Sequence, residues 1–109
     1  MRIVDLKKHI TVISISNLTG ETMRDIILTY DGDSNPIEIL KIKNEYEKVV
    51  FLHIDNLDDL FNLNLLYKGN EYTVYKNIDI NSDVDIKLKI TKDKDDNQRI
   101  NIKSFLYIR

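Results

Sequence analysis

His9 and His53 are the first side chains to consider for chemistry, because they are the two histidines of the chain. A nucleophilic enzyme needs Ser, Thr or Cys beside a base, and a third group that orients the base. The sequence has no Cys and no Gly-x-Ser-x-Gly segment. We expect His9 to be solvated at the start of a strand and His53 to be half-buried on a strand face. We therefore predict no catalytic residue and no enzyme.

Cofactor chemistry finds no support in the spacing of the remaining residues. The three glycines, Gly20, Gly32 and Gly69, form no phosphate-binding loop. Two isolated histidines without Cys do not make a tetrahedral metal site. The many acidic residues offer carboxylate pairs, but no spacing singles out one pair for a hydrolase. We predict no bound cofactor.

Calcium is the one metal with a partial motif. The segment 31–42 begins as an EF-hand loop does, with Asp, Asp and Asn at the first, third and fifth positions. Its sixth residue is Pro36 in place of Gly, and its twelfth is Ile42 in place of Glu. A second acidic segment, 93–104, fails at the same two positions. Both segments are predicted to be turns without a bound metal.

A less local acidic site stays open as a second hypothesis. If successive strands alternate in direction, the loops after the second, fourth and sixth strands emerge at one end of the fold. They would bring together Asp31, Asp33, Asp55, Asp58, Asp59, Asp79, Asp83 and Asp85. This rim resembles that of C2 domains in architecture, without any matching motif. It would suit a cation-dependent ligand- or membrane-binding module, although Asp is also a favoured loop residue.

Apolar residues alternate with polar ones along most of the chain, which is typical of strands. We predict strands at 9–16, 23–30, 37–43, 47–54, 62–68, 71–80, 84–91 and 99–108. The clearest of these places Val84, Ile86, Leu88 and Ile90 on one buried face. The segments 37–43 and 47–54 are apolar on both faces, which suggests central strands or a phase-shifting bulge. Leu57 and Leu60 could form one helical turn capped by Asp55.

These elements predict an all-β fold: one antiparallel β-sandwich of about eight strands, immunoglobulin-like or C2-like in general architecture, spanning 1–109 as one domain. The chain has no Ala, the best helix former, and no Cys for disulfides. Its longest apolar runs have four residues, as in Val49 to Leu52, far short of a membrane span, and no signal-like segment opens it. We expect a cytoplasmic protein, and the residue usage suggests an AT-rich bacterial or phage genome.

The lysines give little support to nucleic-acid binding. Lys41, Lys43, Lys87 and Lys89 would form a basic stripe only if their strands were neighbours, and no aromatic residue interleaves with them. The net charge of −2 also provides no attracting field. We expect no nucleic-acid partner.

The tyrosines divide into two groups by alternation. Tyr30, Tyr67 and Tyr72 fit inward faces, whereas Tyr46 and Tyr75 are predicted to be exposed and are the candidates for partner contact. A small acidic β domain without a catalytic constellation is most simply a protein-binding module. Small inhibitors, immunity proteins and phage antagonists such as anti-CRISPR proteins are of this kind, by association alone. The identity of the partner and a small homo-oligomer stay open.

Overall fold

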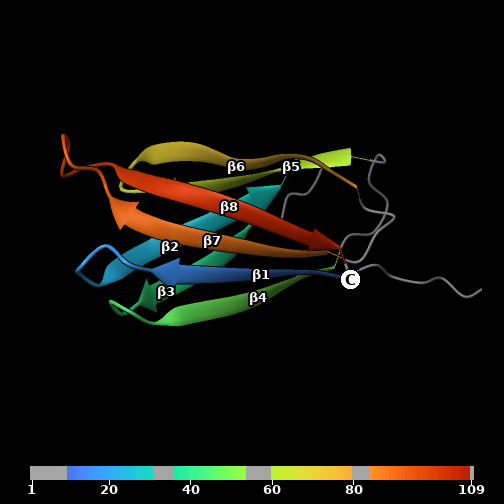
Figure 1. Ribbon diagram of the computed structural model, residues 1–109, viewed down its shortest axis with the longest axis horizontal. Helices are drawn as coiled ribbons and strands as arrows, with labels where there is room; N and C mark the ends of the chain where they lie inside the picture. Colours follow the sequence, from blue (N-terminus) through green and yellow to red (C-terminus); the bar gives the residue numbers. More distant parts are fainter. Residues whose placement is uncertain (1–9, 31–35, 54–59, 80–83, 109) are drawn as a thin grey trace, which may run out of the picture.

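The computed structural model describes residues 10–30, 36–53, 60–79 and 84–108. These residues form eight strands and no helix (Figure 1). The strands are β1 (Ile10–Asn17), β2 (Met23–Tyr30), β3 (Ile37–Ile42), β4 (Glu47–His53), β5 (Leu60–Tyr67), β6 (Asn70–Asp79), β7 (Val84–Lys92) and β8 (Ile100–Ile108). Each lies within two residues of its predicted position, so the all-β prediction is confirmed. In the described segments no helix has the length and apolar character needed to cross a membrane.

The strands form two four-stranded sheets that pack against each other. Sheet A has the order β4-β1-β7-β8, and sheet B has the order β3-β2-β5-β6. The prediction of a fully antiparallel sandwich is wrong at one place, because β1 and β7 pair in parallel. Strand direction does alternate along the chain as expected. Two odd-numbered strands that become neighbours must therefore run the same way.

Strands β3 and β4 are edge strands, so the interpretation of both as central strands is wrong. The alternative, a phase shift, is confirmed in β3. There Ile39 and Ile42 are both buried although they are three residues apart, opposite Ile26 and Met23 of β2. Between these pairs Asp25 has a φ of 55°, a left-handed conformation that resets the alternation in β2 as well.

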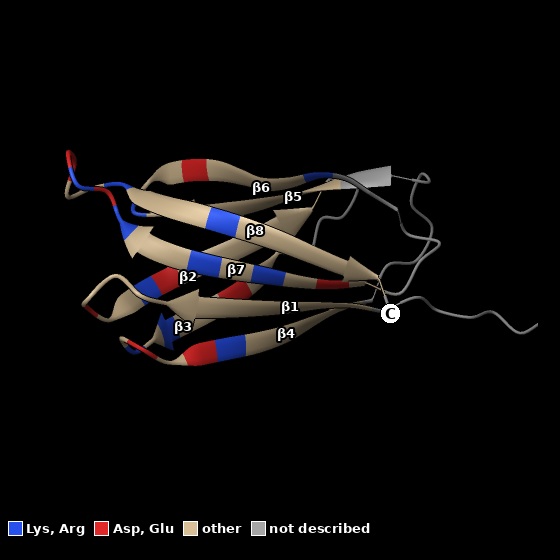
Figure 2. Cartoon of the chain, viewed as in Figure 1, with Lys and Arg blue, Asp and Glu red and all other residues tan. Residues whose placement is uncertain are grey.

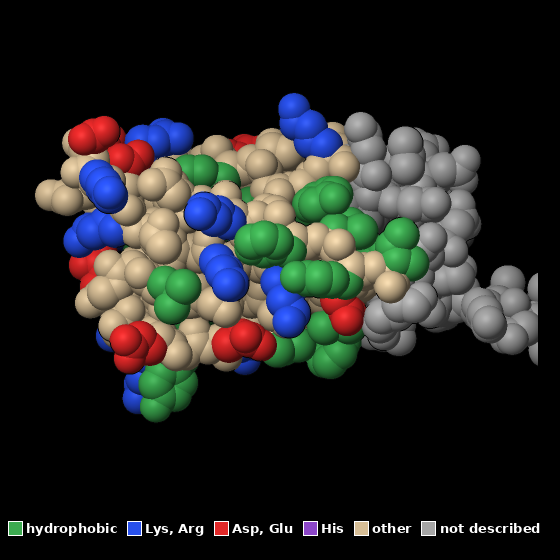
Figure 3. Space-filling view, viewed as in Figure 1, with side chains coloured by type: hydrophobic (Ala, Val, Ile, Leu, Met, Phe, Trp, Pro, Cys, Tyr) green, Lys and Arg blue, Asp and Glu red, His purple; other side chains and the backbone are tan. Residues whose placement is uncertain are grey.

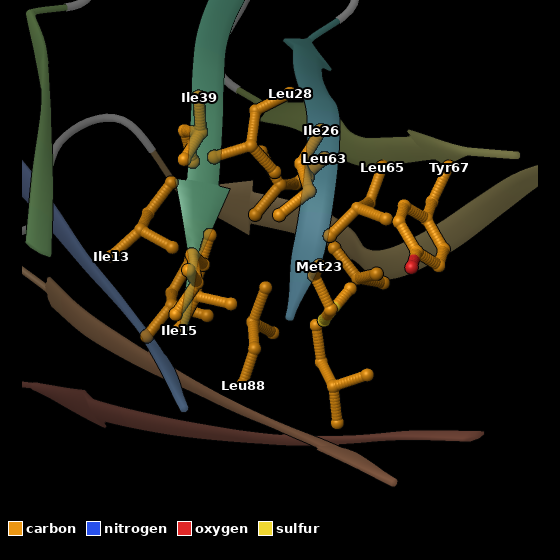
Figure 4. Packing of buried hydrophobic residues seen from close by; sticks show 14 of the residues in the cluster. Ile13, Ile15, Met23, Ile26, Leu28, Ile39, Leu63, Leu65, Tyr67 and Leu88 are labelled. Carbon is orange, nitrogen blue, oxygen red and sulfur yellow. The ribbon is translucent and has the colours of Figure 1, made fainter. Parts of the chain in front are cut away.

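The core lies between the sheets and consists of side chains from both (Figure 4). Sheet A contributes the predicted β7 face, whose four residues are all buried, together with Ile13 and Ile15 of β1. Sheet B contributes residues of β2 and β5, among them Leu28 and Leu65. Since β7 lies inside its sheet, the predicted buried face of a central strand is confirmed.

A buried asparagine joins the two sheets at one end. Asn17, the last residue of β1, is fully buried. Its Nδ2 donates hydrogen bonds to the carbonyl oxygens of Glu21 and of Ile42 in β3, both at 2.7 Å. Its Oδ1 accepts from the backbone N (3.0 Å) and Oγ1 (2.6 Å) of Thr19. One side chain therefore holds the β1–β2 turn and connects sheet A to sheet B.

Glu21 forms an exposed ion-pair cluster at the same end. Its carboxylate oxygens lie 3.4 Å from Nζ of Lys68 and 3.5 Å from Nζ of Lys92. The Lys92 charge, and next the Lys68 charge and hydrogen bond, lower the pKa of the Glu21 carboxyl. A lowered folded-state pKa stabilises the fold above the unfolded-state value, and this contribution is lost as the pH falls through the folded-state pKa.

We expect an NMR pH titration to place the Glu21 carboxyl midpoint below the ordinary glutamate range, about 4.3. Lys92→Gln should raise this midpoint, since it removes the charge that lowers the Glu21 pKa most. Added salt should raise the midpoint further by screening the remaining charge. Lys76→Gln on β6 removes the same charge without touching the cluster and serves as the control. A midpoint that does not respond to Lys92→Gln would show that the cluster does not form in solution.

Candidate binding surface

The outward face of sheet A places apolar and basic side chains side by side. In β7 the buried residues alternate with Asp85, Lys87 and Lys89, which point away from the core. Asp85 is level with Val12 of β1 and Tyr107 of β8. The strand register therefore fixes which side chains meet on this face.

Three rows cross the four strands of sheet A. The first row is Phe51, Val12, Asp85 and Tyr107; the second is Val49, Ser14, Lys87 and Phe105; the third is Glu47, Ser16, Lys89 and Lys103. We call the apolar and lysine members of these rows the apolar–lysine face: Val12, Val49, Phe51, Phe105, Tyr107, Lys87, Lys89 and Lys103. Figure 3 shows green hydrophobic and blue basic side chains intermingled over this side of the molecule.

Large apolar side chains on this face are open to solvent. Phe51 is 59% exposed and Tyr107 52%, while Val49 and Phe105 are 42% and 40% exposed. Single exposed apolar residues are ordinary, whereas a group of them on one sheet face is a feature that interaction surfaces share. The described part of the chain leaves between 40% and 59% of each of these side chains exposed.

The lysines lie over the aromatic rings of the neighbouring strand. Nζ of Lys87 is 5.6 Å from the centroid of the Tyr107 ring, and Nζ of Lys89 is 5.6 Å from that of Phe105. Each lysine therefore contacts a ring diagonal to it across the strand pair. The residue directly opposite Lys87 is Phe105, and the residue directly opposite Lys89 is Lys103. Blue segments mark the basic residues of β7 and β8 in Figure 2. These cation–π contacts hold positive charge and aromatic surface together.

This face changes the interpretation of the lysines in two respects. The stripe that required the 37–43 and 84–91 strands to be neighbours does not form, because β3 belongs to sheet B and β7 to sheet A. The statement that no aromatic residue interleaves with the lysines is also wrong, since Phe105 and Tyr107 do so from β8. The register between β7 and β8 brings the lysines and the aromatic residues together, and the alternation pattern of the sequence does not specify this register.

The tyrosine predictions have mixed outcomes. Tyr30 and Tyr67 are buried and Tyr72 is partly buried against the core, as predicted. Tyr46 is 65% exposed, as predicted, but it lies in the β3–β4 turn, beyond the apolar–lysine face. The prediction that Tyr75 is exposed is wrong, because its side chain is partly buried and packs against the core. The β5–β6 register shifts beside Leu63, so that Tyr75 and the preceding Val74 both contact the core.

Most of the predicted acidic rim lies outside the described residues. This holds for Asp31, Asp33, Asp55, Asp58, Asp59 and Asp83, and also for the side chain of Asp79. Asp85 is described and lies half-buried on the outward face of β7. Among the described residues no group of three or more His, Cys, Asp or Glu could hold a metal ion. The cation hypothesis stays a prediction.

The histidines and the predicted helical turn lie largely outside the described residues as well. His9 is not described, and His53 is placed only as the last backbone position of β4. Asp55 and Leu57 are also undescribed, whereas Leu60 is the first residue of β5. The prediction that neither histidine is catalytic stays a prediction.

A shallow cleft of about 460 Å³ lies between β6 and β8. Several of its polar groups bond to one another. The Tyr72 hydroxyl accepts from the backbone N of Ile100 at 3.2 Å, and Arg99 lies 5.3 Å from the Tyr72 ring centroid. The Ser104 Oγ donates to the Val74 carbonyl at 2.5 Å. These contacts join the edge strands β6 and β8 of the two sheets, so the residues of the cleft serve to hold the sandwich together.

Comparison with known proteins adds information about the fold alone. No family model matches the chain, and no curated protein matches it. The chain is similar to an NMR structure of a protein from Eubacterium rectale, with a TM-score of 0.57 and 15% sequence identity. The match covers 94% of this chain and 93% of the other. At this identity the likeness supports a shared fold, and it indicates neither activity nor partner.

Sequence reasoning missed Phe51, Phe105 and Tyr107 as exposed surface residues. The available signal was the apolar character of both faces in 47–54 and at the end of 99–108. Apolar residues on both faces of a strand fit either a central strand or an edge strand with an uncovered face. Strand order, which decides between the two, could not be read from the sequence.

Proposed function

We propose that the protein is a non-catalytic protein-binding module that recognises its partner through the apolar–lysine face. The single observation behind this proposal is the group of exposed apolar residues on one sheet face, namely Val49, Phe51, Phe105 and Tyr107. Aromatic residues are enriched in protein interfaces, and a few buried aromatic anchors supply most of the binding energy. Phe51 and Tyr107 stand at the two ends of one cross-strand row and would frame such a contact.

The rigid support under this face favours recognition of a partner of fixed shape. The same strands that present Phe51, Lys87 and Phe105 outward place buried residues such as Leu52 and Ile86 inward. Side chains on paired strands lose little further freedom on binding, which reduces the entropic cost of association. A role as a small inhibitor, immunity or antagonist protein in the cytoplasm of bacteria or in phage infection fits such a module. That role is proposed by association with proteins of similar size.

For topology we propose only a likeness in general architecture to immunoglobulin-like and C2-like domains, which also pack two sheets. Constant-type immunoglobulin domains place the first strand beside the second, in a sheet with the fourth and fifth. Here the first strand lies between β4 and β7. The likeness to constant-type immunoglobulin domains therefore does not extend to strand order.

The experiment compares the capture of proteins from a lysate of the host by three forms of the full chain. The wild type and Leu40→Ser should retain the same specific protein, whereas Phe51→Ser combined with Phe105→Ser should lose it. Leu40 is the matched control, because it is 80% exposed and lies on β3 in the other sheet. Loss of an anchor residue typically weakens binding by about 2 kcal/mol or more, roughly thirtyfold.

Circular dichroism must first show that each variant is folded. Retention of the captured protein by a folded Phe51→Ser/Phe105→Ser variant would contradict the proposal. Loss on Leu40→Ser alone would place the binding surface on sheet B instead.

A further inference from the structure

We propose that the partner bound by the apolar–lysine face is an acidic protein surface, whose carboxylates meet Lys87, Lys89 and Lys103. This inference rests on the proposed function and specifies the chemistry of the partner. The partner's carboxylates would lie beside apolar side chains that contact Phe105 and Phe51. Both kinds of group are needed, because the lysines and the rings occupy the same rows of sheet A.

The first support is a local positive charge on a chain that is negative overall. The net charge is −2, yet the outward rows of sheet A contain three lysines and two carboxylates, Glu47 and Asp85. Glu47 lies at the far edge of the sheet, on β4. The β7–β8 half of the face is therefore the basic part, and it would attract an acidic partner.

The second support is the pairing of like charges within this half. Lys89 stands directly opposite Lys103 in the β7–β8 register. Like charges in such positions destabilise a sheet. Within the described residues, the ion pairs of lysines are those of Lys68 and Lys92 with Glu21, and none involves the three lysines of the face. Carboxylates supplied by a partner would neutralise this charge.

The third support is the position of the ammonium groups over the rings. Lys87 and Lys89 make their cation–π contacts without using their hydrogen-bond donors. A partner carboxylate can accept from such an ammonium group while an adjacent apolar side chain covers the ring edge. Acidic residues next to apolar ones on the partner would match this face.

Other occupants match less well. A second copy of the face carries the same excess of lysines over carboxylates, so it cannot supply the negative charge that the first copy lacks. Single-stranded nucleic acid requires rings with accessible faces in a basic groove. Here Lys87 and Lys89 lie over the two rings of β8 and occupy the faces on which bases would have to stack. The charge distribution thus favours an acidic protein.

The test is a ¹⁵N NMR titration of the full chain with three probes. The first is a short synthetic peptide in which Glu alternates with Leu; the second has Lys in place of Glu; the third is oligo(dT). We expect the acidic peptide to shift amide signals of β1, β7 and β8. We expect the basic peptide to leave them unchanged, and oligo(dT) to bind more weakly than the acidic peptide.

Two triple variants supply the matched comparison. Lys87→Gln/Lys89→Gln/Lys103→Gln should weaken binding of the acidic peptide by about tenfold or more, as should high salt. Lys41→Gln/Lys43→Gln/Lys76→Gln removes the same charge from β3, the residue following it, and β6, and should leave binding within about twofold. Tighter binding of oligo(dT) would overturn the inference in favour of nucleic acid.

Equal effects of the two triple variants, or no shifts with the acidic peptide, would also overturn the acidic-partner inference. The proposed function fails in a different experiment. If capture from lysate depends on Phe51 and Phe105 while the lysine variants bind the captured protein normally, the protein-binding function stands and the acidic partner is wrong.

Discussion

Ile86→Asp is expected to abolish folding of the protein. Ile86 lies fully buried on β7, between the two sheets. The substitution would place a carboxylate where no partner is available, and the loss of apolar packing adds to that cost. Together these effects amount to several kcal/mol, a large part of the roughly 5–15 kcal/mol that stabilises a domain.

Circular dichroism and urea unfolding of graded variants measure this effect. Ile86→Val should lower the free energy of unfolding by about 1 kcal/mol and Ile86→Ala by about 3 kcal/mol. The control is Thr91→Asp, which places the same charge at an exposed position of β7 and should change stability by less than about 0.5 kcal/mol. A cooperative transition at the wild-type temperature for Ile86→Asp would show that β7 does not face the core.

Asn17→Ala is the second substitution with a large expected effect. Here the loss of stability comes from broken hydrogen bonds, whereas at Ile86 it comes mainly from the apolar core. It removes the donor to the buried carbonyl of Ile42, one of the two donors to the carbonyl of Glu21, which keeps Thr19 Oγ1 at 2.9 Å, and the acceptor that holds Thr19. Buried groups left without a partner cost about 1–3 kcal/mol each, so we expect a loss of about 2–4 kcal/mol. For a domain of this size the melting temperature should fall by roughly 10–20 °C.

Asn44→Ala is the matched control in the adjacent turn. Asn44 Oδ1 accepts one exposed hydrogen bond, from the backbone N of Gly20 at 2.8 Å, and its loss should cost below about 1 kcal/mol. Asn17→Asp keeps the acceptor for Thr19 but removes both donors and buries a charge, so it should be no more stable than Asn17→Ala. Equal melting temperatures for the wild type and Asn17→Ala would mean that these hydrogen bonds do not connect the sheets.

Much of the fold could be predicted because alternation is a local property. Val84, Ile86, Leu88 and Ile90 appear on one face in the sequence and are buried in the structure. Turn residues such as Gly69, which has a φ of 75°, separate the strands at the expected places. Local patterns therefore located the strands and the inward face of β7.

Strand order and register could not be predicted in the same way. The parallel pairing of β1 with β7 joins segments about seventy residues apart, and no local pattern specifies it. The β5–β6 register shift beside Leu63 brings Tyr75 to the core together with Val74, although alternation predicts opposite faces for these two residues. The apolar–lysine face depends on both kinds of information, because Lys87, Phe51 and Phe105 come from three separate strands.

Site-specific photocrosslinking tests the central claim, that the outward face of sheet A is the binding surface, most directly. A photoreactive phenylalanine analogue replaces Phe51, Phe105 or, as the control, Leu40 in the full chain, and crosslinked proteins from the host lysate are identified by mass spectrometry. We predict that positions 51 and 105 crosslink to the same protein and that position 40 does not. Crosslinking of that protein from position 40, with none from 51 or 105, would contradict the account.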